Sequence, residues 1–201
     1  MSKQSRVLCV LMALAVTALT GVPASASSLI RSSLDQLSAD NSLVVMGEVV
    51  DFESYWNEAG DFILTDVRIR PLQVVKGKIL EQELTITLMG GTVGETTTLI
   101  IGGPEFVPGS SYVLFLNRED LPGAAQALTV RDHCQGVFDI VLAGDQLRAI
   151  SQANNFSLVP DRLGYFDAAG GAEGYPLNAM FDTVRQNDAL AVQETELNPE
   201  K

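Results

Sequence analysis

Hydrophobic and polar residues alternate over many short stretches of this 201-residue chain. The alternation is clearest at 62–70 and 84–88. A period of two places successive side chains on opposite faces, so these two stretches predict half-buried strands. Residues 43–52 form a dense β-branched run with one glycine, which predicts a buried strand. Further strands are expected at 96–101, 112–116, 128–132, 137–142 and 147–150. Seven or eight short strands at this spacing are typical of a β-barrel or a β-sandwich.

Glycine and proline mark the expected irregularities in these strands. Gly47 lies inside the first strand and predicts a bend or bulge. Pro71 interrupts the pattern of the second strand, which is therefore expected to lie on a sheet edge or to bend there. Residues 53–61 predict a hairpin loop between these strands. Gly144-Asp145 predicts a two-residue turn, in which glycine supplies a positive φ.

Helical spacing appears on both sides of the strand-rich region. Residues 28–38 predict a short amphipathic helix, capped by Ser27 or Ser28, with apolar positions Leu29, Ile30, Leu34 and Leu37. A short helix is also expected after Pro176, which suits a first helical turn, with apolar positions Leu177, Met180, Phe181 and Val184. Residues 188–201 are polar and acidic, and we expect them to form a disordered tail.

The first 26 residues have the features of a signal peptide. Lys3 and Arg6 precede an apolar run from Val7 to Leu19, and Ala24-Ser25-Ala26 supplies small residues for cleavage. We therefore expect export to the periplasm or the extracellular space and a single folded domain over residues 27–187. The apolar run is shorter than the roughly 20 residues of a membrane-spanning helix, so no membrane span is expected.

Charge narrows the range of partners. The formal net charge is −12, and removal of residues 1–26 would leave 11 basic and 25 acidic residues, a charge of −14. Nucleic acids and anionic membranes require a basic surface, so neither is an expected partner. Acidic surplus also keeps proteins soluble. We expect a monomer that binds no cofactor.

The stretch Arg131–Gly136 places the chain's single histidine, His133, beside Cys134, which is the single cysteine of the expected mature chain. One cysteine forms no intramolecular disulfide, so an apolar core must stabilise the domain. On a regular strand His133 and Cys134 would point apart, which disfavours a catalytic pair. A zinc site needs three or four ligands, drawn mainly from cysteine and histidine, so no metal site is expected.

Several motifs between Leu43 and Leu116 resemble exported bacterial proteins that are similar to the netrin-type module and to tissue inhibitors of metalloproteinases. The motifs are a VxGxV-like strand at Val45–Val49, a Lys76-Gly77 turn and a GxxYxxFL segment at Gly109–Leu116. This resemblance implies an OB-like Greek-key barrel, flanked here by the two short helices. Those inhibitors chelate zinc through an amino-terminal cysteine and need disulfides, neither of which the expected mature chain offers.

The candidate binding residues lie in two expected loops at one end of the barrel. They are Tyr55, Trp56, Gly103, Pro104, Glu105 and Phe106. Aromatic side chains are frequent anchors at interfaces, although Trp56 would equally serve to close the barrel end. The leading hypothesis is a non-enzymatic domain that recognises an exported protein such as a metalloprotease. The alternatives are a module for carbohydrate or an envelope polymer, since OB-type barrels also bind oligosaccharides, and a hydrolase that uses carboxylates alone.

Overall fold

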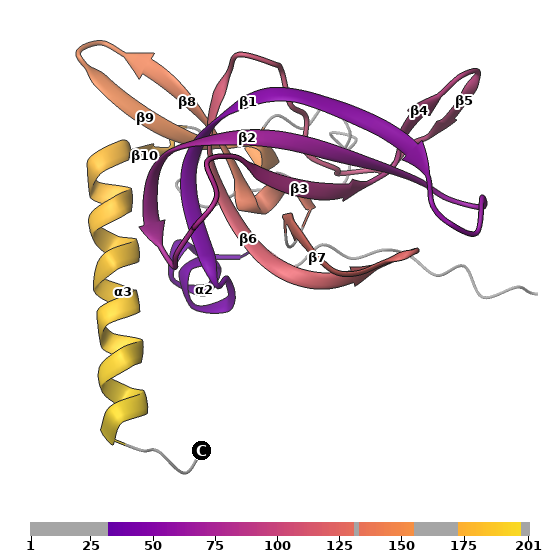
Figure 1. Cartoon of the computed structure of the whole chain (residues 1–201). Helices are drawn as coiled ribbons and strands as arrows, with labels where there is room; N and C mark the ends of the chain where they lie inside the picture. The colour runs from indigo at the N-terminus through magenta and orange to yellow at the C-terminus, as the bar shows by residue number, and fades with distance from the viewer. Residues whose placement is uncertain (1–31, 131–132, 155–172, 198–201) are drawn as a thin grey trace, which may run out of the picture. The chain divides into compact units, whose positions relative to one another are not determined.

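A computed structural model describes residues 32–130, 133–154 and 173–197, all of which belong to one compact unit. The expected signal peptide lies outside these residues. In chain order the elements are α2 (Leu34–Asp40), β1 (Leu43–Trp56), β2 (Ile63–Lys76), β3 (Leu84–Met89), β4 (Gly91–Val93), β5 (Thr96–Thr98), β6 (Ser111–Leu121), β7 (Ala124–Val130), a 3₁₀ turn (His133–Gly136), β8 (Val137–Ala143), β9 (Gln146–Ser151), a second 3₁₀ turn (Gln152–Asn154), β10 (Tyr175–Pro176) and α3 (Leu177–Leu197) (Figure 1).

The expected mainly β class with an N-terminal and a C-terminal helix is confirmed. One antiparallel sheet runs in the order β10-β9-β8-β6-β1-β2-β3, and β7 also pairs with β6. The edge of β6 opposite β1 is divided, because Tyr112–Leu114 pair with β8 and Leu116–Leu121 pair with β7. The expected closed barrel is wrong, since no ladder joins β3 to β7 in the described part of the chain and the sheet stays open.

Alternating side chains of the central strands build two apolar cores. Val45, Leu114 and Leu116 face a cluster enclosed by β1, β2, β3, β6 and β7. Val44 and Phe115 face the opposite side, where α2 and α3 cover the sheet. Neighbouring residues of β1 and β6 therefore belong to different clusters. A shift of the register by one residue would exchange the side chains of the two cores.

Gly47 and Pro71 meet at an irregularity of the β1–β2 ladder. Met46 is paired with Gln73 and Gly47 with Pro71, so the ladder is irregular at Gly47 as predicted, but the extra residue is Leu72 in β2 rather than a residue of β1. A Cβ at Gly47 would overlap the side chain of Ile69, so the strands approach closely here. β2 continues past Pro71 to Lys76, and the irregularity at Leu72 directly follows the proline. The expected edge position applies locally, because β3 pairs with β2 only from Leu64 to Ile69.

Both helices pack where the apolar spacing predicts, with different limits. Within α3 the expected apolar positions are buried, namely Leu177, Met180, Phe181 and Val184. The N-terminal helix begins at Leu34, later than predicted, since Ser33 forms a capping box with Gln36. The proposed caps Ser27 and Ser28 lie outside the described residues. None of the described helices combines the length and apolar character needed to cross a membrane.

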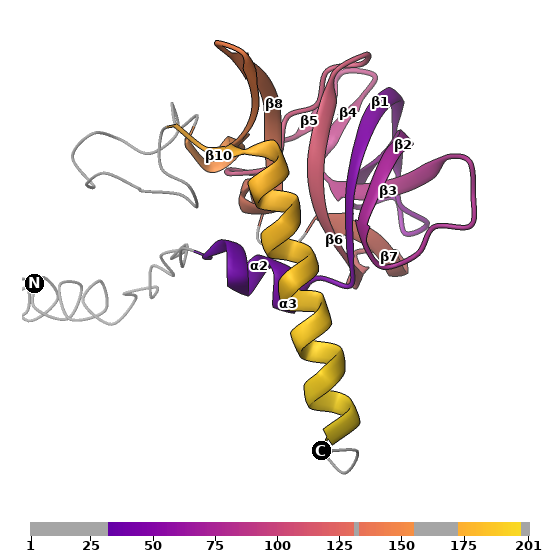
Figure 2. The same ribbon diagram turned by 90° about the vertical axis from the view of Figure 1, so that its left-hand side faces the viewer.

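The tail predicted to be disordered from Asp188 is instead helical as far as Leu197. The C-terminal half of α3 extends beyond the sheet (Figures 1 and 2). Its first turns are held by packing, and Asn187 Nδ2 donates a hydrogen bond of 2.9 Å to Asp35 Oδ1. Adding residues to an existing helix costs little, and Ala189, Leu190 and Ala191 are good helix formers. Polar composition alone therefore gave the wrong prediction.

Candidate functional site

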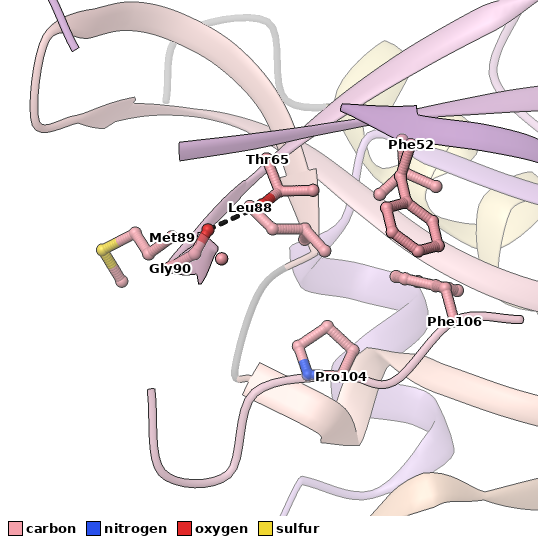
Figure 3. A pocket seen from close by; sticks show the side chains of 9 residues that line it. Phe52, Thr65, Leu88, Met89, Gly90, Pro104 and Phe106 are labelled. Atoms are coloured by element: carbon pink, nitrogen blue, oxygen red, sulfur yellow. Dashed lines mark hydrogen bonds between the residues drawn. The ribbon is translucent and has the colours of Figure 1, made fainter. Parts of the chain in front are cut away.

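An apolar hollow of about 180 Å³ opens at one end of the enclosed core (Figure 3). Its walls come from three places in the chain: β1 and β2, the end of β3 with the glycines that follow it, and the 99–110 loop that leads into β6. The lining residues are Phe52, Thr65, Val67, Leu88, Met89, Gly90, Gly91, Pro104 and Phe106. An apolar protein cavity of about 150 Å³ holds benzene, so this hollow has room for a phenyl-sized group.

Strand register brings the β1, β2 and β3 residues to one face. Phe52 of β1 is paired with Val67 of β2, and Thr65 of β2 is paired with Leu88 of β3. A register shift between Val49 and Asp51 places Phe52 on the face that Val49 occupies deeper in the core. Phe52 remains 50% exposed, so its ring is available at the opening of the hollow.

Two glycines let the chain cross the sheet at the edge of the hollow. The hydroxyl of Thr65 donates a hydrogen bond of 2.7 Å to the carbonyl oxygen of Gly90. At the next residue, Gly91, a Cβ would overlap the hydroxyls of Ser54 and Thr65, and φ is +131°. Only glycine tolerates both the close approach and this backbone conformation. The β4–β5 hairpin therefore starts directly from the wall of the hollow.

The opposite wall is the 99–110 loop, which hydrogen bonds hold at several points. Gln152 pairs with the backbone of Glu105, accepting from its N–H at 2.9 Å and donating to its carbonyl oxygen at 2.7 Å. The N–H of Cys134 donates to the Gly102 carbonyl oxygen at 3.0 Å. Near β6, the N–H of Gly109 donates to the Val49 carbonyl oxygen at 2.8 Å. The loop is thus fixed to both flanking parts of the sheet.

Phe106 is the aromatic residue that this loop contributes. Its ring packs edge-on against Tyr112, with ring centroids 5.1 Å apart. The Tyr112 hydroxyl accepts a hydrogen bond of 2.9 Å from the Val107 N–H, which fixes the next residue as well. Figure 3 shows the rings of Phe52 and Phe106 pointing toward one another across the hollow. Two aromatic rings from distant parts of the sequence therefore frame the opening.

The outer rim of the loop is also apolar. Leu99, Ile101 and Val107 are 78%, 74% and 59% exposed. All three belong to the loop that forms one wall of the hollow, and exposed apolar side chains close to a binding site extend the surface available to a partner. We call Leu99, Ile101 and Val107 the loop rim.

The structure brings together some of the residues proposed from the sequence. Pro104 and Phe106 line the hollow, and Glu105 lies between them with an exposed side chain. Gly103 makes a turn in the same loop, where its N–H donates to the Ile100 carbonyl oxygen at 3.1 Å. These four residues come from the predicted loop, and their backbone is held in place.

Tyr55 and Trp56 lie elsewhere, and their predicted position in a loop is wrong. Both belong to the end of β1, which runs to Trp56. The Tyr55 hydroxyl donates to Asp66 Oδ1 at 3.2 Å, and burial together with the Asp66 charge raises the pKa of this phenol. Trp56 is 41% exposed but is not among the residues that line the hollow.

Sequence reasoning missed Phe52, Val67, Leu88 and Met89 as parts of this site. From the sequence, these residues were interpreted only as parts of the predicted strands. The signal that identifies them is their shared position in the pairing of β1, β2 and β3, which requires the register. The register shift between Val49 and Asp51 also changes the face of the sheet on which Phe52 lies, and alternation in a single sequence does not reveal this shift.

The stretch around Cys134 forms a 3₁₀ turn rather than part of a regular strand. The predicted alternation of His133 and Cys134 across a strand is therefore wrong, and the His133 side chain lies outside the part described. Cys134 is 4% exposed, and burial raises the pKa of its thiol, which keeps it protonated. Its observed contact is the backbone bond to Gly102, so Cys134 helps to hold the 99–110 loop.

The nine lining residues contribute no ionisable side chain to the hollow. Within the described residues, histidine, cysteine and carboxylate side chains form no group of three that would suit a metal ion. The arrangement is suited to excluding water from an apolar group, because aromatic and aliphatic side chains provide most of the lining.

Comparison with known proteins adds no relative. No family model matches the chain, and no curated protein is recognisably similar to it. The resemblance to the netrin-type module stays a prediction that rests on the three motifs between Val45 and Leu116.

Proposed function

We propose that this protein is a non-enzymatic, exported binding domain that accepts an apolar side chain of a partner protein in the hollow. The observation that carries this proposal is the pair of aromatic rings, Phe52 and Phe106, that frame an open apolar space beside the exposed loop rim. Interface hot spots have this form, with an anchor side chain entering a pocket that neighbouring residues shield from water.

The hydrogen bonds of the 99–110 loop support the same conclusion. A wall that is already fixed before binding loses little conformational entropy when a partner arrives. Burial of one phenylalanine or leucine side chain contributes about 1.5–3 kcal/mol, which corresponds to about 10- to 150-fold in Kd. The hollow alone therefore provides an anchor, and the loop rim extends the contact.

Two other functions have less support from this site. A carbohydrate has hydroxyls on most of its surface, whereas the hollow offers one side-chain hydroxyl, Thr65, which is bound to Gly90. A hydrolase that uses carboxylates needs acidic groups around the substrate, and none lines the hollow. An exported protein is the expected partner, and a metalloprotease is the candidate that the family resemblance suggests.

Selection from a random peptide library tests this proposal. Immobilised protein should enrich peptides that share an aromatic or large aliphatic residue. Phe52→Ser should lose their binding, because the change removes one wall of the hollow at an exposed position. The matched control is Leu80→Ser, since Leu80 is 92% exposed and does not line the hollow. Absence of enrichment, or equal binding by Phe52→Ser, would contradict the proposal.

A further inference from the structure

The part of the chain that builds the hollow carries a surplus of acidic residues. All nine lining residues lie between Phe52 and Phe106. This span contains eight acidic residues and four basic ones. A partner that places an apolar side chain in the hollow must bring its flanking residues close to this surface.

Nearby arginines neutralise only part of this charge. Arg68 pairs with Asp51, and Arg70 Nη2 lies 2.6 Å from Glu48 Oε1. In the described part of the chain, no salt bridge joins a cation to Glu95 or Glu105. Glu105 is exposed between two lining residues of the loop, and Glu95 is exposed at the turn of the β4–β5 hairpin. Glu105 therefore places a negative charge in the wall of the hollow that no salt bridge of the described residues neutralises.

We propose that the occupant of the hollow is a basic segment of a partner protein, with one aromatic or large aliphatic residue flanked by lysine or arginine. The inference rests on the proposed function, because it concerns the same hollow and adds the charge of the ligand. Complementary charge accelerates association and rejects partners of like charge. The apolar residue supplies the anchor, and the flanking cations supply the selectivity.

A second copy of this chain fits the hollow poorly. One exposed apolar segment that a copy would offer is its loop rim, and the same loop carries Glu105. Two copies would therefore bring like charges together, on a chain whose formal net charge is −12. Like-charge contact disfavours such a pairing.

Fluorescence anisotropy with four short peptides tests the inference on the purified protein. Three peptides carry a central phenylalanine flanked by lysines, by serines or by glutamates, and the fourth carries a central serine flanked by lysines. We expect the lysine–phenylalanine peptide to bind at least about tenfold more tightly than the glutamate–phenylalanine peptide at low salt. This ratio should approach one in about 1 M NaCl, where the Debye length is about 3 Å.

Variants assign the effect to the hollow. Glu105→Gln should raise the Kd of the lysine–phenylalanine peptide about two- to fivefold, because one surface charge is lost. The Kd of the serine–phenylalanine peptide should stay unchanged. The charge-matched control is Asp145→Asn, at an exposed position in the β8–β9 turn, and it should change the Kd of neither peptide. Phe52→Ser should weaken the binding of every phenylalanine peptide, because the anchor site is lost.

The outcomes separate the two proposals. Equal binding of the three phenylalanine peptides would overturn the basic partner and leave the proposed function standing. Failure of all three to bind would overturn both. Equal binding of the two lysine-flanked peptides would show that charge acts without the hollow and would also overturn both. A dimer in light scattering that Phe52→Ser abolishes would identify a second copy as the occupant and overturn the basic segment.

Discussion

Gly91 lies where the chain leaving β3 crosses the hydroxyls of Ser54 and Thr65. Gly91→Ala should lower the free energy of unfolding by about 2–4 kcal/mol, since it adds both overlap and backbone strain. Urea denaturation followed by circular dichroism measures this loss.

The matched control for this change is Gly94→Ala in the next turn. Gly94 also has a positive φ, +60°, but a Cβ there would have no neighbour within 4 Å. It should cost only about 1–2 kcal/mol, from backbone strain alone. Equal losses at the two positions would show that the close approach of β4 to Ser54 and Thr65 contributes nothing.

Cys134 makes stability depend on pH in the alkaline range. Burial raises the pKa of its thiol in the folded state, so the unfolded chain loses this proton first as pH rises. The contribution is complete below the ordinary thiol pKa of about 8.5 and is lost as pH rises toward the folded pKa. Between about pH 7.5 and about pH 10, wild type should therefore lose more stability than Cys134→Ala. Parallel pH profiles would contradict this account of the thiol.

Among the elements, the 99–110 loop depends on a side chain from outside it. Gln152 holds the Glu105 backbone and also donates to Asp139 Oδ1 at 3.0 Å. Gln152→Ala should cost about 1–2 kcal/mol of stability and should weaken peptide binding, because the loop loses its attachment. Gln146→Ala, at an exposed position of β9, is the control and should change stability by less than about 0.5 kcal/mol. Unchanged binding by a folded Gln152→Ala variant would show that the attachment does not shape the hollow.

Helix α3 contains a buried part and an exposed part. Substitution by alanine should lower the stability of the protein much more in the buried part than in the exposed one. Met180 is fully buried against the sheet, whereas Leu190 is 57% exposed. Met180→Ala should lower the free energy of unfolding by about 2–4 kcal/mol, and Leu190→Ala by less than about 0.5 kcal/mol. A large effect at Leu190, measured by urea denaturation, would mean that the C-terminal half of α3 packs against something that the described residues do not include.

The elements were predictable where local pattern determines them. A β-branched run located β1, alternation located β2 and β3, and the spacing from Leu177 to Val184 located the buried face of α3. The pattern failed where local signals compete. β2 continues past Pro71 because a bulge follows it at Leu72 and β3 no longer pairs there, and the polar residues after Asp188 continue a helix that packing has already started.

At the scale of the whole molecule, the hollow was beyond prediction from one sequence. Pro104 and Phe106 were found because a turn-rich loop with an aromatic residue is visible locally. Phe52 joins them only through the strand pairing, and the register shift after Val49 decides which way it faces. Tyr55 and Trp56 were the more conspicuous aromatic residues, yet neither lines the hollow. Long-range pairing therefore determined the site, and composition did not.

The most direct test of the account is a methyl chemical-shift titration of the protein with the lysine–phenylalanine peptide. Binding in the hollow should shift the methyl signals of Val67, Leu88 and Met89 together, with one saturation curve, because all three line the same space. The methyls of Leu142 and Leu147, which are exposed on the β8–β9 hairpin, should stay in place. Saturating binding that shifts Leu142 and Leu147 but leaves Val67, Leu88 and Met89 unchanged would contradict the claim that this hollow receives the partner.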